Sequence, residues 1–287
     1  MNGRLKVLEK TAIERFKAFE PEDGYYLAYS GGKDSDVIKI LAQLAGVKFE
    51  AVHNLTTVDA PETVQYIKSQ PDVRIDYPEK SMWRLIQDKL LPPTRIVRYC
   101  CSEFKEKGGQ GKIKVTGVRW SESVRRKQSA AVINVIGKPK TMQKTATEMG
   151  VDFQVSNQNG LIMNDDNDIN RRFVEHCYRT AAILFNPIVD WLDNDIWDFL
   201  GYYGCKSNPQ YQCGFKRIGC IGCPMAGKHR YTEFRLYPIY YQNYIRAFDR
   251  MIARRKEKGL ETEWENGEEV MKWWLGEDVN QLTFDDL

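Results

Sequence analysis

The feature that most constrains the fold is a short apolar segment that runs directly into a glycine turn. Residues 25–29 read Tyr-Tyr-Leu-Ala-Tyr, a run of β-favouring side chains, and residues 30–35 read Ser-Gly-Gly-Lys-Asp-Ser. Residues 34–41 then have the periodicity of a helix. The pattern predicts a strand, a tight glycine turn and the start of a helix, in that order.

This predicted turn is suited to bind phosphate. Gly31 and Gly32 can adopt positive φ angles, so backbone N–H groups can converge without a Cβ between them. These amides and the positive end of the helix dipole attract an anion. Lys33 adds a mobile charge, and Ser30 and Ser35 add hydroxyl donors. The alternative interpretation is an ordinary glycine-rich turn, because short motifs also occur by chance.

Length and charge limit the class of protein. The chain has 287 residues, enough for a full hydrophobic core, and its formal net charge is only +3. This balance gives no general indication of a nucleic-acid or membrane partner. The sequence has neither a charged-then-apolar leader nor an apolar run of about 18 residues. We therefore expect a soluble, cytoplasmic protein without a membrane partner.

Strand-like and helix-like segments alternate along the chain, and this alternation predicts an α/β fold. We expect a mainly parallel, twisted sheet with helices on both faces and functional loops at the carboxyl ends of its strands. Residues 130–180 fit the alternation poorly and are interpreted as an insertion. The predicted nucleotide-binding domain covers residues 1–204, and a cysteine-rich segment with a helical tail covers residues 205–287. The strands are predicted at residues 25–29, 49–53, 73–76, 112–117 and 183–188.

The chain has seven cysteines, which in a reducing compartment indicate a metal site rather than disulfides. Cys220 and Cys223 form a C-x-x-C motif, which brings two thiolates to one centre. The adjacent Cys100 and Cys101 are the obvious second pair, and their Cα atoms lie about 3.8 Å apart. Such neighbours suit a cubane, in which each thiolate binds its own iron, better than one tetrahedral zinc. The alternative is a zinc site formed by Cys205, Cys213, Cys220 and Cys223.

These motifs resemble those of known families. The hexapeptide at residues 30–35 resembles the PP-loop of the ATP pyrophosphatases, which split ATP into an adenylyl group and pyrophosphate. A Cys-Cys pair followed at long range by C-x-x-C resembles the 4Fe–4S motif of the adenylyl-sulfate and phosphoadenylyl-sulfate (PAPS) reductases. Residues 116–125, 186–197 and 208–220 are similar to the T-G-x-R…E-S…R, N-P-L-x-x-W…D-V-W and N-P-L-Y…G-C segments of that family.

The resemblance implies an adenine nucleotide alpha hydrolase-like fold and a role for each motif. The loop would hold the phosphates of ATP, adenylyl sulfate or PAPS, with Mg²⁺ bridging them if ATP is the substrate. Asp34 would orient that metal or the loop, and Arg119 and Arg125 would neutralise charge on the transferred group. The implied 4Fe–4S ligands are Cys100, Cys101, Cys220 and Cys223. The implied catalytic residues are Lys33, Asp34, Arg119 and Arg125, and the implied nucleotide-binding residues are Ser30, Gly31, Gly32, Lys33, Asp34, Ser35, Thr116, Gly117 and Arg119.

The sequence also departs from the reductases. Their thioredoxin-coupled catalysis uses a cysteine in a C-terminal Glu-Cys-Gly-Leu-His motif, whereas no cysteine follows Cys223 in this sequence. Their phosphate loop is often degenerate, whereas residues 30–35 have the full pyrophosphatase form, as in the sulfur-inserting component of DNA phosphorothioation systems. We therefore expect ATP cleavage coupled to sulfur transfer or activation, with a sulfur donor such as a cysteine desulfurase. The alternatives are a sulfonucleotide reductase of sulfate assimilation and an inactive, nucleotide-binding regulatory protein.

Residues 230–256 combine arginines with tyrosines and are a candidate surface for binding the acceptor or another partner. Arginine interleaved with tyrosine suits a nucleic acid, which makes a nucleic-acid acceptor one candidate partner; a homodimer is another. The alternative is an amphipathic helix with a solvated basic side and an aromatic core side. The side chains concerned are Arg230, Arg235, Arg246, Arg250, Arg254, Arg255 and Lys256 with Tyr231, Tyr237, Tyr240, Tyr241 and Tyr244.

Overall fold

The computed structural model describes residues 1–137, 139–156 and 160–277, and the chain forms two compact units. The first unit consists of Met1–His53, Glu62–Asp76 and Gly108–Ile218. The second unit consists of Asn54–Pro61, Tyr77–Lys107 and the chain from Gly219 onward. The predicted boundary at residue 204 divides the chain once, whereas the second unit is assembled from three separate segments.

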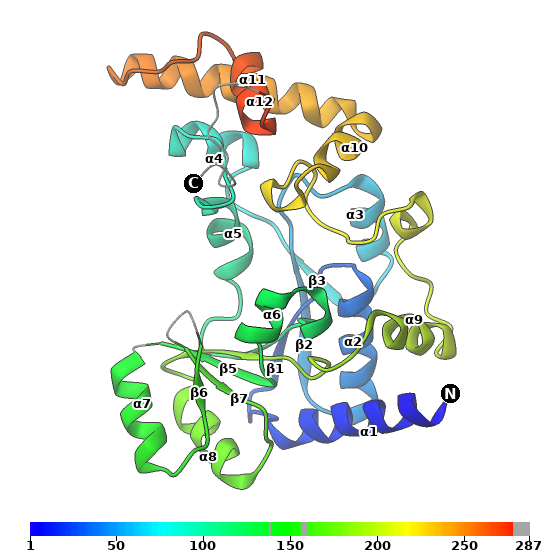
Figure 1. Ribbon diagram of the computed structural model, residues 1–287. Coiled ribbons are helices and arrows are strands. Elements are labelled where there is room, and N and C mark those ends of the chain that lie inside the picture. The colour runs from blue at the N-terminus through cyan, green and yellow to red at the C-terminus, as the bar shows by residue number, and fades with distance from the viewer. Residues whose placement is uncertain (138, 157–159, 278–287) are drawn as a thin grey trace. The chain divides into compact units, whose positions relative to one another are not determined.

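The first unit is built around an eight-stranded sheet, which Figure 1 shows flanked by helices. The strands are β1 (Tyr25–Ala28), β2 (Phe49–Asn54), β3 (Val73–Asp76), β4 (Ile113–Val115), β5 (Ile133–Ile136), β6 (Gln154–Val155), β7 (Leu161–Met163) and β8 (Ala182–Phe185). Their order in the sheet is β3-β2-β1-β4-β8-β5-β7-β6. β1 pairs in parallel with β2 and β4, and β4 pairs in parallel with β8. The predicted α/β class with a largely parallel sheet is confirmed.

The strands β5, β6 and β7 form the antiparallel end of the sheet and all fall within residues 130–180. They are four, two and three residues long. Their antiparallel pairing differs from the parallel strand–helix alternation on which the sequence prediction rested. The stretch that fits the βα alternation poorly therefore extends the main sheet by three strands.

Helices and loops cover the sheet of the first unit. Its helices are α1 (Gly3–Ala18), α2 (Lys33–Ala45), α3 (Pro61–Lys68), α6 (Val124–Ser129), α7 (Pro139–Glu148), α8 (Asp168–Cys177) and α9 (Asp193–Tyr202). The ring of Tyr25 in β1 packs edge-on against Phe16 of α1 and stacks on Phe185 of β8. The next residue, Tyr26, lies on the opposite face, where a Cβ on Gly109 would come within 2.5 Å of its ring. Both faces of β1 are therefore covered, as in a buried parallel strand.

The second unit has a helical core of its own. Its helices are α4 (Met82–Lys89), α5 (Tyr99–Cys101), α10 (His229–Leu236), α11 (Pro238–Glu257) and α12 (Gly267–Leu275). α11 packs against α4 and α12 through Phe248, Met251 and Val270, all fully buried. A Cβ on Gly267 would lie 2.3 Å from the carbonyl oxygen of Ile245, so α12 begins in direct contact with α11. Throughout the described ranges, the helices are too short or too polar to span a bilayer.

Candidate functional site

Residues 30–35, called the phosphate loop below, have the predicted local structure. α2 begins at Lys33, directly after β1 and the glycine turn. Gly31 has a φ of +73°, and a Cβ at this position would lie 2.9 Å from Ile67, so conformation and packing both favour glycine. The Ser35 hydroxyl accepts a hydrogen bond from Gly32 N (3.1 Å) and donates one to Gly32 O (2.7 Å). These bonds fix the turn, so that the N-terminus of α2 lies at the carboxyl end of β1, where anions bind.

Four charged side chains meet beside this loop. Arg119 donates from Nε to Asp34 Oδ1 (2.7 Å) and from Nη2 to Asp193 Oδ1 (2.9 Å). Lys33 Nζ lies 3.4 Å from Asp34 Oδ2 and 3.3 Å from Asp193 Oδ1. Arg119 is only 2 % exposed, so its charge is held almost out of water. The group contains two cations and two carboxylates and is therefore neutral as a whole.

The carboxylate of Asp193 responds to these cations. Partial burial would raise its pKa, but the charges of Lys33 and Arg119 and their hydrogen bonds lower it overall. Asp193 is the first residue of α9, and the N-cap position belongs to Leu192. The backbone N–H of Leu192 is bound by Asp195 Oδ2 instead (2.8 Å), which leaves Asp193 to pair with the cations.

The other residues implied for the nucleotide site differ in placement. Gly117 packs against the start of α2, where a Cβ would lie 2.8 Å from Asp34 Cβ. The hydroxyl of Thr116 donates to Asn186 at the end of β8. Arg125 is exposed on α6, and its side chain forms no ion pair with any residue that the structure describes. The structure thus brings Lys33, Asp34 and Arg119 together but does not bring Arg125 to them.

Residues 208–211 contact the phosphate loop, a role that the sequence did not predict. The backbone N–H of Lys33 donates to the Tyr211 hydroxyl (2.8 Å). Asn208 is fully buried and donates from Nδ2 to Gly31 O and to Thr63 Oγ1, both at 3.0 Å. The only signal for this contact was the Asn-Pro-Gln-Tyr segment, whose distance along the chain gives no indication of what it touches.

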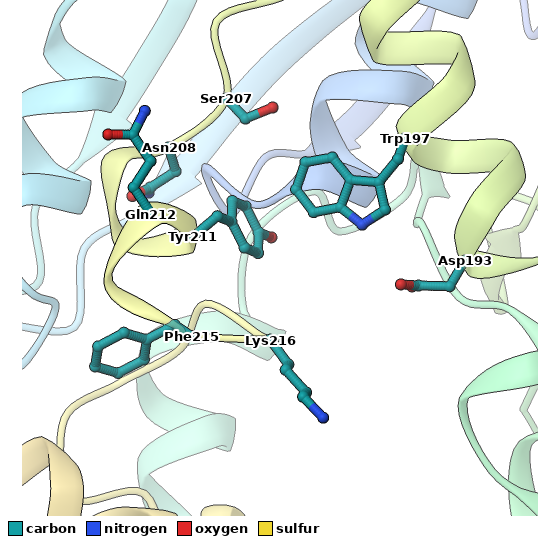
Figure 2. A pocket seen from close by; sticks show the side chains of 8 residues that line it. All are labelled: Asp193, Trp197, Ser207, Asn208, Tyr211, Gln212, Phe215 and Lys216. Atoms are coloured by element: carbon teal, nitrogen blue, oxygen red, sulfur yellow. The ribbon is translucent and has the colours of Figure 1, made fainter.

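A cavity of about 570 Å³ adjoins the charged group. Asp193 and Trp197 of α9 form one side of it in Figure 2, and Tyr211, Phe215 and Lys216 lie across from them. Asp193 belongs both to the charged group and to the wall of the cavity. A molecule in the cavity would therefore lie next to the phosphate loop.

Asp36, in the first turn of α2, has a buried carboxylate. Asp36 accepts hydrogen bonds from the hydroxyls of Tyr29 and Tyr66. Burial raises the pKa of Asp36 to about 6, although these hydrogen bonds and the charge of Lys39 act against the shift. The Cys205 thiol is hydrogen-bonded to Tyr66 in the same place. Cys205 therefore has a partner in the core of the first unit.

All four cysteines implied as cluster ligands belong to the second unit. A hydrogen bond with Cys101, burial, and the charges of Cys101, Cys220 and Cys223 raise the pKa of Cys100. The four thiols thus share one electrostatic environment. Within the parts of the chain that the structure describes, no three histidine, cysteine or acidic side chains converge closely enough to hold a single metal ion.

The C-x-x-C loop is held by backbone contacts on both sides. Ile221 N donates to Val58 O (2.8 Å), and the Tyr244 hydroxyl donates to Ile221 O (3.0 Å). Gly222 N donates to Glu233 Oε2 (2.7 Å), and its φ of +74° requires a glycine. These bonds explain why residues 54–61 belong to the second unit rather than to the sheet.

Lys105 also belongs to the cysteine site, although it was not predicted from the sequence. Its ammonium group is hydrogen-bonded to Cys220, and the charges of Cys220, Asp59 and Cys101 raise its pKa despite desolvation. Lys105 follows Cys101 by four residues in a helical segment, the spacing that places two side chains on one face. That spacing was the available signal.

The basic and aromatic segment forms α10 and α11, and much of it is used internally. Tyr244 is fully buried, and the Tyr240 hydroxyl donates to Asp59 O (3.0 Å). Arg230 lies over the ring of Trp274 at 5.1 Å, and Arg254 pairs with Asp88. These side chains match the alternative of an amphipathic helix. Arg246 and Arg250 are exposed, and with Trp83 and Asn243 they line a small hollow of about 150 Å³.

The fold and the loop together define a class of protein. A glycine turn at a helix N-terminus, on the carboxyl edge of a parallel sheet, is a nucleotide-binding arrangement of α/β proteins. Residues 24–226 match the family model of the phosphoadenosine phosphosulfate reductase domain. Because this match covers most of the 287 residues, the chain belongs to that family.

Two relatives are themselves uncharacterized. The chain is 25% identical over 258 residues to a protein of Methanocaldococcus jannaschii, an alignment that covers 86% of this chain and 54% of the relative. It is 30% identical over 80 residues to a 37.8 kDa protein of Escherichia phage 186, covering 28% of this chain and 24% of that protein. The chain therefore spans about half the length, or less, of these curated relatives.

The solved structures that the chain matches are remote in sequence. PAPS reductase from Candida auris in a phosphate complex has a TM-score of 0.45 and 15% identity, covering 77% of this chain and 96% of that chain. Candida glabrata FMN adenylyltransferase with FAD and inorganic pyrophosphate has a TM-score of 0.42 and 14% identity, covering 76% and 64%. NMN synthetase from Francisella tularensis has a TM-score of 0.35 and 10% identity, covering 99% and 98%.

Proposed function

We propose that the protein is an ATP-cleaving enzyme of the PAPS reductase family that works in sulfur transfer or activation. In the proposed reaction, an oxygen of the acceptor forms a bond to the α-phosphorus of ATP. The bond from that phosphorus to the bridging oxygen breaks, and pyrophosphate leaves with the electron pair. The observation that carries the proposal is the complete Ser-Gly-Gly-Lys-Asp-Ser loop at the N-terminus of α2, with Lys33 and Arg119 held beside it.

The side chains of this site have roles that follow from their contacts. The amides of the loop and the N-terminus of α2 would bind the phosphates. Lys33 and Arg119 are now paired with carboxylates, so a phosphate would compete with Asp34 and Asp193 for the same donors. Both cations lie beside the loop, so once they exchange these carboxylates for phosphate oxygens they would stabilise charge on the leaving pyrophosphate.

The donor set near the loop also fits Mg²⁺, which prefers carboxylate and phosphate oxygens. Asp34 and Asp193 would hold the ion, together with the phosphates of ATP. Bound there, Mg²⁺ would neutralise part of the phosphate charge. Asp34 is the stronger candidate, because it lies in the first turn of α2, directly after the loop.

The cysteine group of the second unit is proposed to hold a 4Fe–4S cluster. The supporting observation is that Cys100, Cys101, Cys220 and Cys223 share one electrostatic environment, with the Lys105 ammonium beside them. Thiolates are the ligands such clusters take in proteins, and a neighbouring cation favours thiolate over thiol. When bound, the cluster would supply a soft metal centre for a sulfur-bearing group, such as one delivered by a cysteine desulfurase.

The test of the main proposal is to identify the products. Purified protein is incubated with α-labelled ATP and Mg²⁺, and the expected products are pyrophosphate together with AMP or an adenylated acceptor. Release of ADP and orthophosphate would contradict the proposal. Lys10 of α1 is exposed and offers a matched control, since Lys10→Ala removes the same charge as Lys33→Ala at a different place.

A sulfonucleotide reductase is the second candidate, and the family match is the observation that favours it. It predicts release of sulfite from PAPS or adenylyl sulfate when a dithiol reductant is supplied. The regulatory alternative predicts binding of the nucleotide without turnover of ATP, PAPS or adenylyl sulfate. The same preparation can be tested for all three outcomes.

A further inference from the structure

The cavity beside the phosphate loop has two kinds of wall. The N-terminal half of α9 contributes Asp193 and Trp197, and residues 207–216 contribute the rest. At about 570 Å³ the cavity falls within the usual range for a small-molecule site. Figure 2 shows the indole of Trp197 and the ammonium group of Lys216 at the border of the same open space.

The aromatic wall is fixed and still accessible. The rings of Trp197 and Tyr211 meet edge-on, with centroids 5.0 Å apart and an interplanar angle of 88°. Tyr211 is in turn tied to the phosphate loop through the Lys33 amide. Trp197 nevertheless remains 37 % exposed. A large exposed indole held in one orientation is a surface on which a planar heterocycle can stack.

The two charged side chains of the cavity, Asp193 and Lys216, differ in whether they already form ion pairs. The carboxylate of Asp193 is already paired with Lys33 and Arg119, as part of the neutral group beside the phosphate loop. Lys216 is exposed and forms no ion pair with any described residue. Its ammonium group is therefore free to bind an anion. The cavity offers an aromatic face and a positive charge, and its Asp193 end adjoins the Lys33 side chain.

We propose that this cavity binds the acceptor of the adenylyl group, and that the acceptor is a planar heterocycle carrying a phosphate, such as a nucleotide unit. The heterocycle stacks on Trp197, and the phosphate is bound by Lys216. This inference rests on the proposed function, because it places an acceptor next to the phosphates of ATP. A free mononucleotide and one unit of an oligonucleotide have the same chemistry and are distinguished by the experiment.

The experiment uses the full chain saturated with the non-hydrolysable analogue AMPCPP, so that the ATP site is filled. Two fluorinated nucleotides, 5-fluoro-UMP and 2-fluoro-AMP, and a short oligonucleotide containing 5-fluorouridine are then added separately. Binding is followed by broadening of the ¹⁹F resonance. We expect at least one of the three probes to bind, and the free and the oligonucleotide arms identify its source.

Two substitutions test the assigned contacts. Trp197→Leu removes the stacking face and should weaken the bound probe by about 10-fold, whereas Trp197→Phe keeps an aromatic ring and should retain most of the affinity. Lys216→Gln should weaken a bound nucleotide by about 10-fold and leave binding of its nucleoside unchanged. Lys206→Gln is the matched control, because Lys206 is also an exposed lysine but does not line the cavity.

Different results would refute the proposed function and the acceptor cavity. If AMPCPP does not bind, the proposed function fails, and the probes are then added to the protein alone. If none of the three probes binds under either condition, the acceptor cavity is refuted. It is also refuted if a probe binds equally well to the wild-type protein, the Trp197→Leu variant and the Lys216→Gln variant.

Discussion

The phosphate loop of the first unit and the cysteine group of the second unit are assembled differently. The loop is one stretch of chain, and its shape follows from two glycines and the hydrogen bonds of Ser35. The cysteine group draws on Cys100 and Cys101 from α5 and on the C-x-x-C loop, which is held by residues 54–61 and by α11. A contiguous site is specified by local conformation, whereas a site gathered from distant segments depends on the packing of its whole unit.

Because the loop site is specified locally, we expect that its activity can be removed with little loss of structure. Lys33→Ala should reduce pyrophosphate release by about 100-fold or more, because it removes a charge held next to the transferred phosphates. The melting temperature should stay close to that of the wild type, and Lys10→Ala should keep full activity. Equal activity of Lys33→Ala and the wild type would make the loop a structural turn.

At the cysteine site, by contrast, we expect a substitution to change both the iron content and the stability of the second unit. Protein purified without oxygen should be brown and contain about four irons per chain. Cys220→Ser should remove most of this iron and destabilise the second unit, because a bound cluster would tie the C-x-x-C loop to Cys100 and Cys101 of α5. Elemental analysis and visible absorption measure the effect. Zinc without iron in the wild-type protein would contradict the cluster.

Substituting the glycines near the two ends of α2 distinguishes the energetic cost of backbone strain from the cost of a packing clash. Gly31 and Gly46 have similar φ angles of +73° and +69°, but only at Gly31 would a Cβ meet a neighbour, Ile67 at 2.9 Å. Gly46→Ala should therefore lower the free energy of unfolding by about 1 kcal/mol through strain alone. Gly31→Ala should lower it by roughly 2–4 kcal/mol and also weaken ATP binding. Urea unfolding of both variants tests this difference, which would vanish if the loop were loosely packed.

The pH dependence of the free energy of unfolding should reveal the ionisation of the buried carboxylate of Asp36. Burial raises the pKa of Asp36 from its ordinary value of 3.8 to about 6, so the folded state holds this proton more tightly than the unfolded state. The free energy of unfolding, relative to Asp36→Asn, should fall by up to about 3 kcal/mol as the pH rises through this window and stay constant above it. Urea titrations of both proteins at about pH 4.5 and about pH 7.5 measure the change. Parallel pH profiles would show that Asp36 ionises normally.

The smallest expected effect concerns nucleic acid and the second unit. Arg246 and Arg250 line the hollow beside Trp83, and Arg254 already pairs with Asp88. If an oligonucleotide contacts this face, Arg246→Glu with Arg250→Glu should weaken its binding by several-fold at about 50 mM salt and leave ATP binding unchanged. Fluorescence anisotropy measures it. No oligonucleotide binding by the wild type at that salt concentration would leave α11 as a solvated helix face.

The sequence was informative where the signal is local. Residues 25–41 predicted a strand, a glycine turn and a helix, and the parallel part of the sheet followed from the same kind of pattern. The pairing of Asp193 was missed, because Asp193 and Asp195 lie two residues apart and either could cap α9. The contact of Tyr211 with the Lys33 amide joins positions far apart in the chain, which periodicity cannot detect.

The division of the chain into alternating segments has a consequence for folding. The second unit needs residues 54–61 and 77–107, which the ribosome makes early, together with helices α10–α12, which it makes only after the chain of the first unit. Its core therefore cannot close until α11 and α12 have emerged, and contacts of such high sequence separation form slowly. For the same reason, no single cut in the chain separates the two units. A truncation after Ile218 would leave the early segments of the second unit without the apolar side chains that bury them, so such a fragment should aggregate rather than fold.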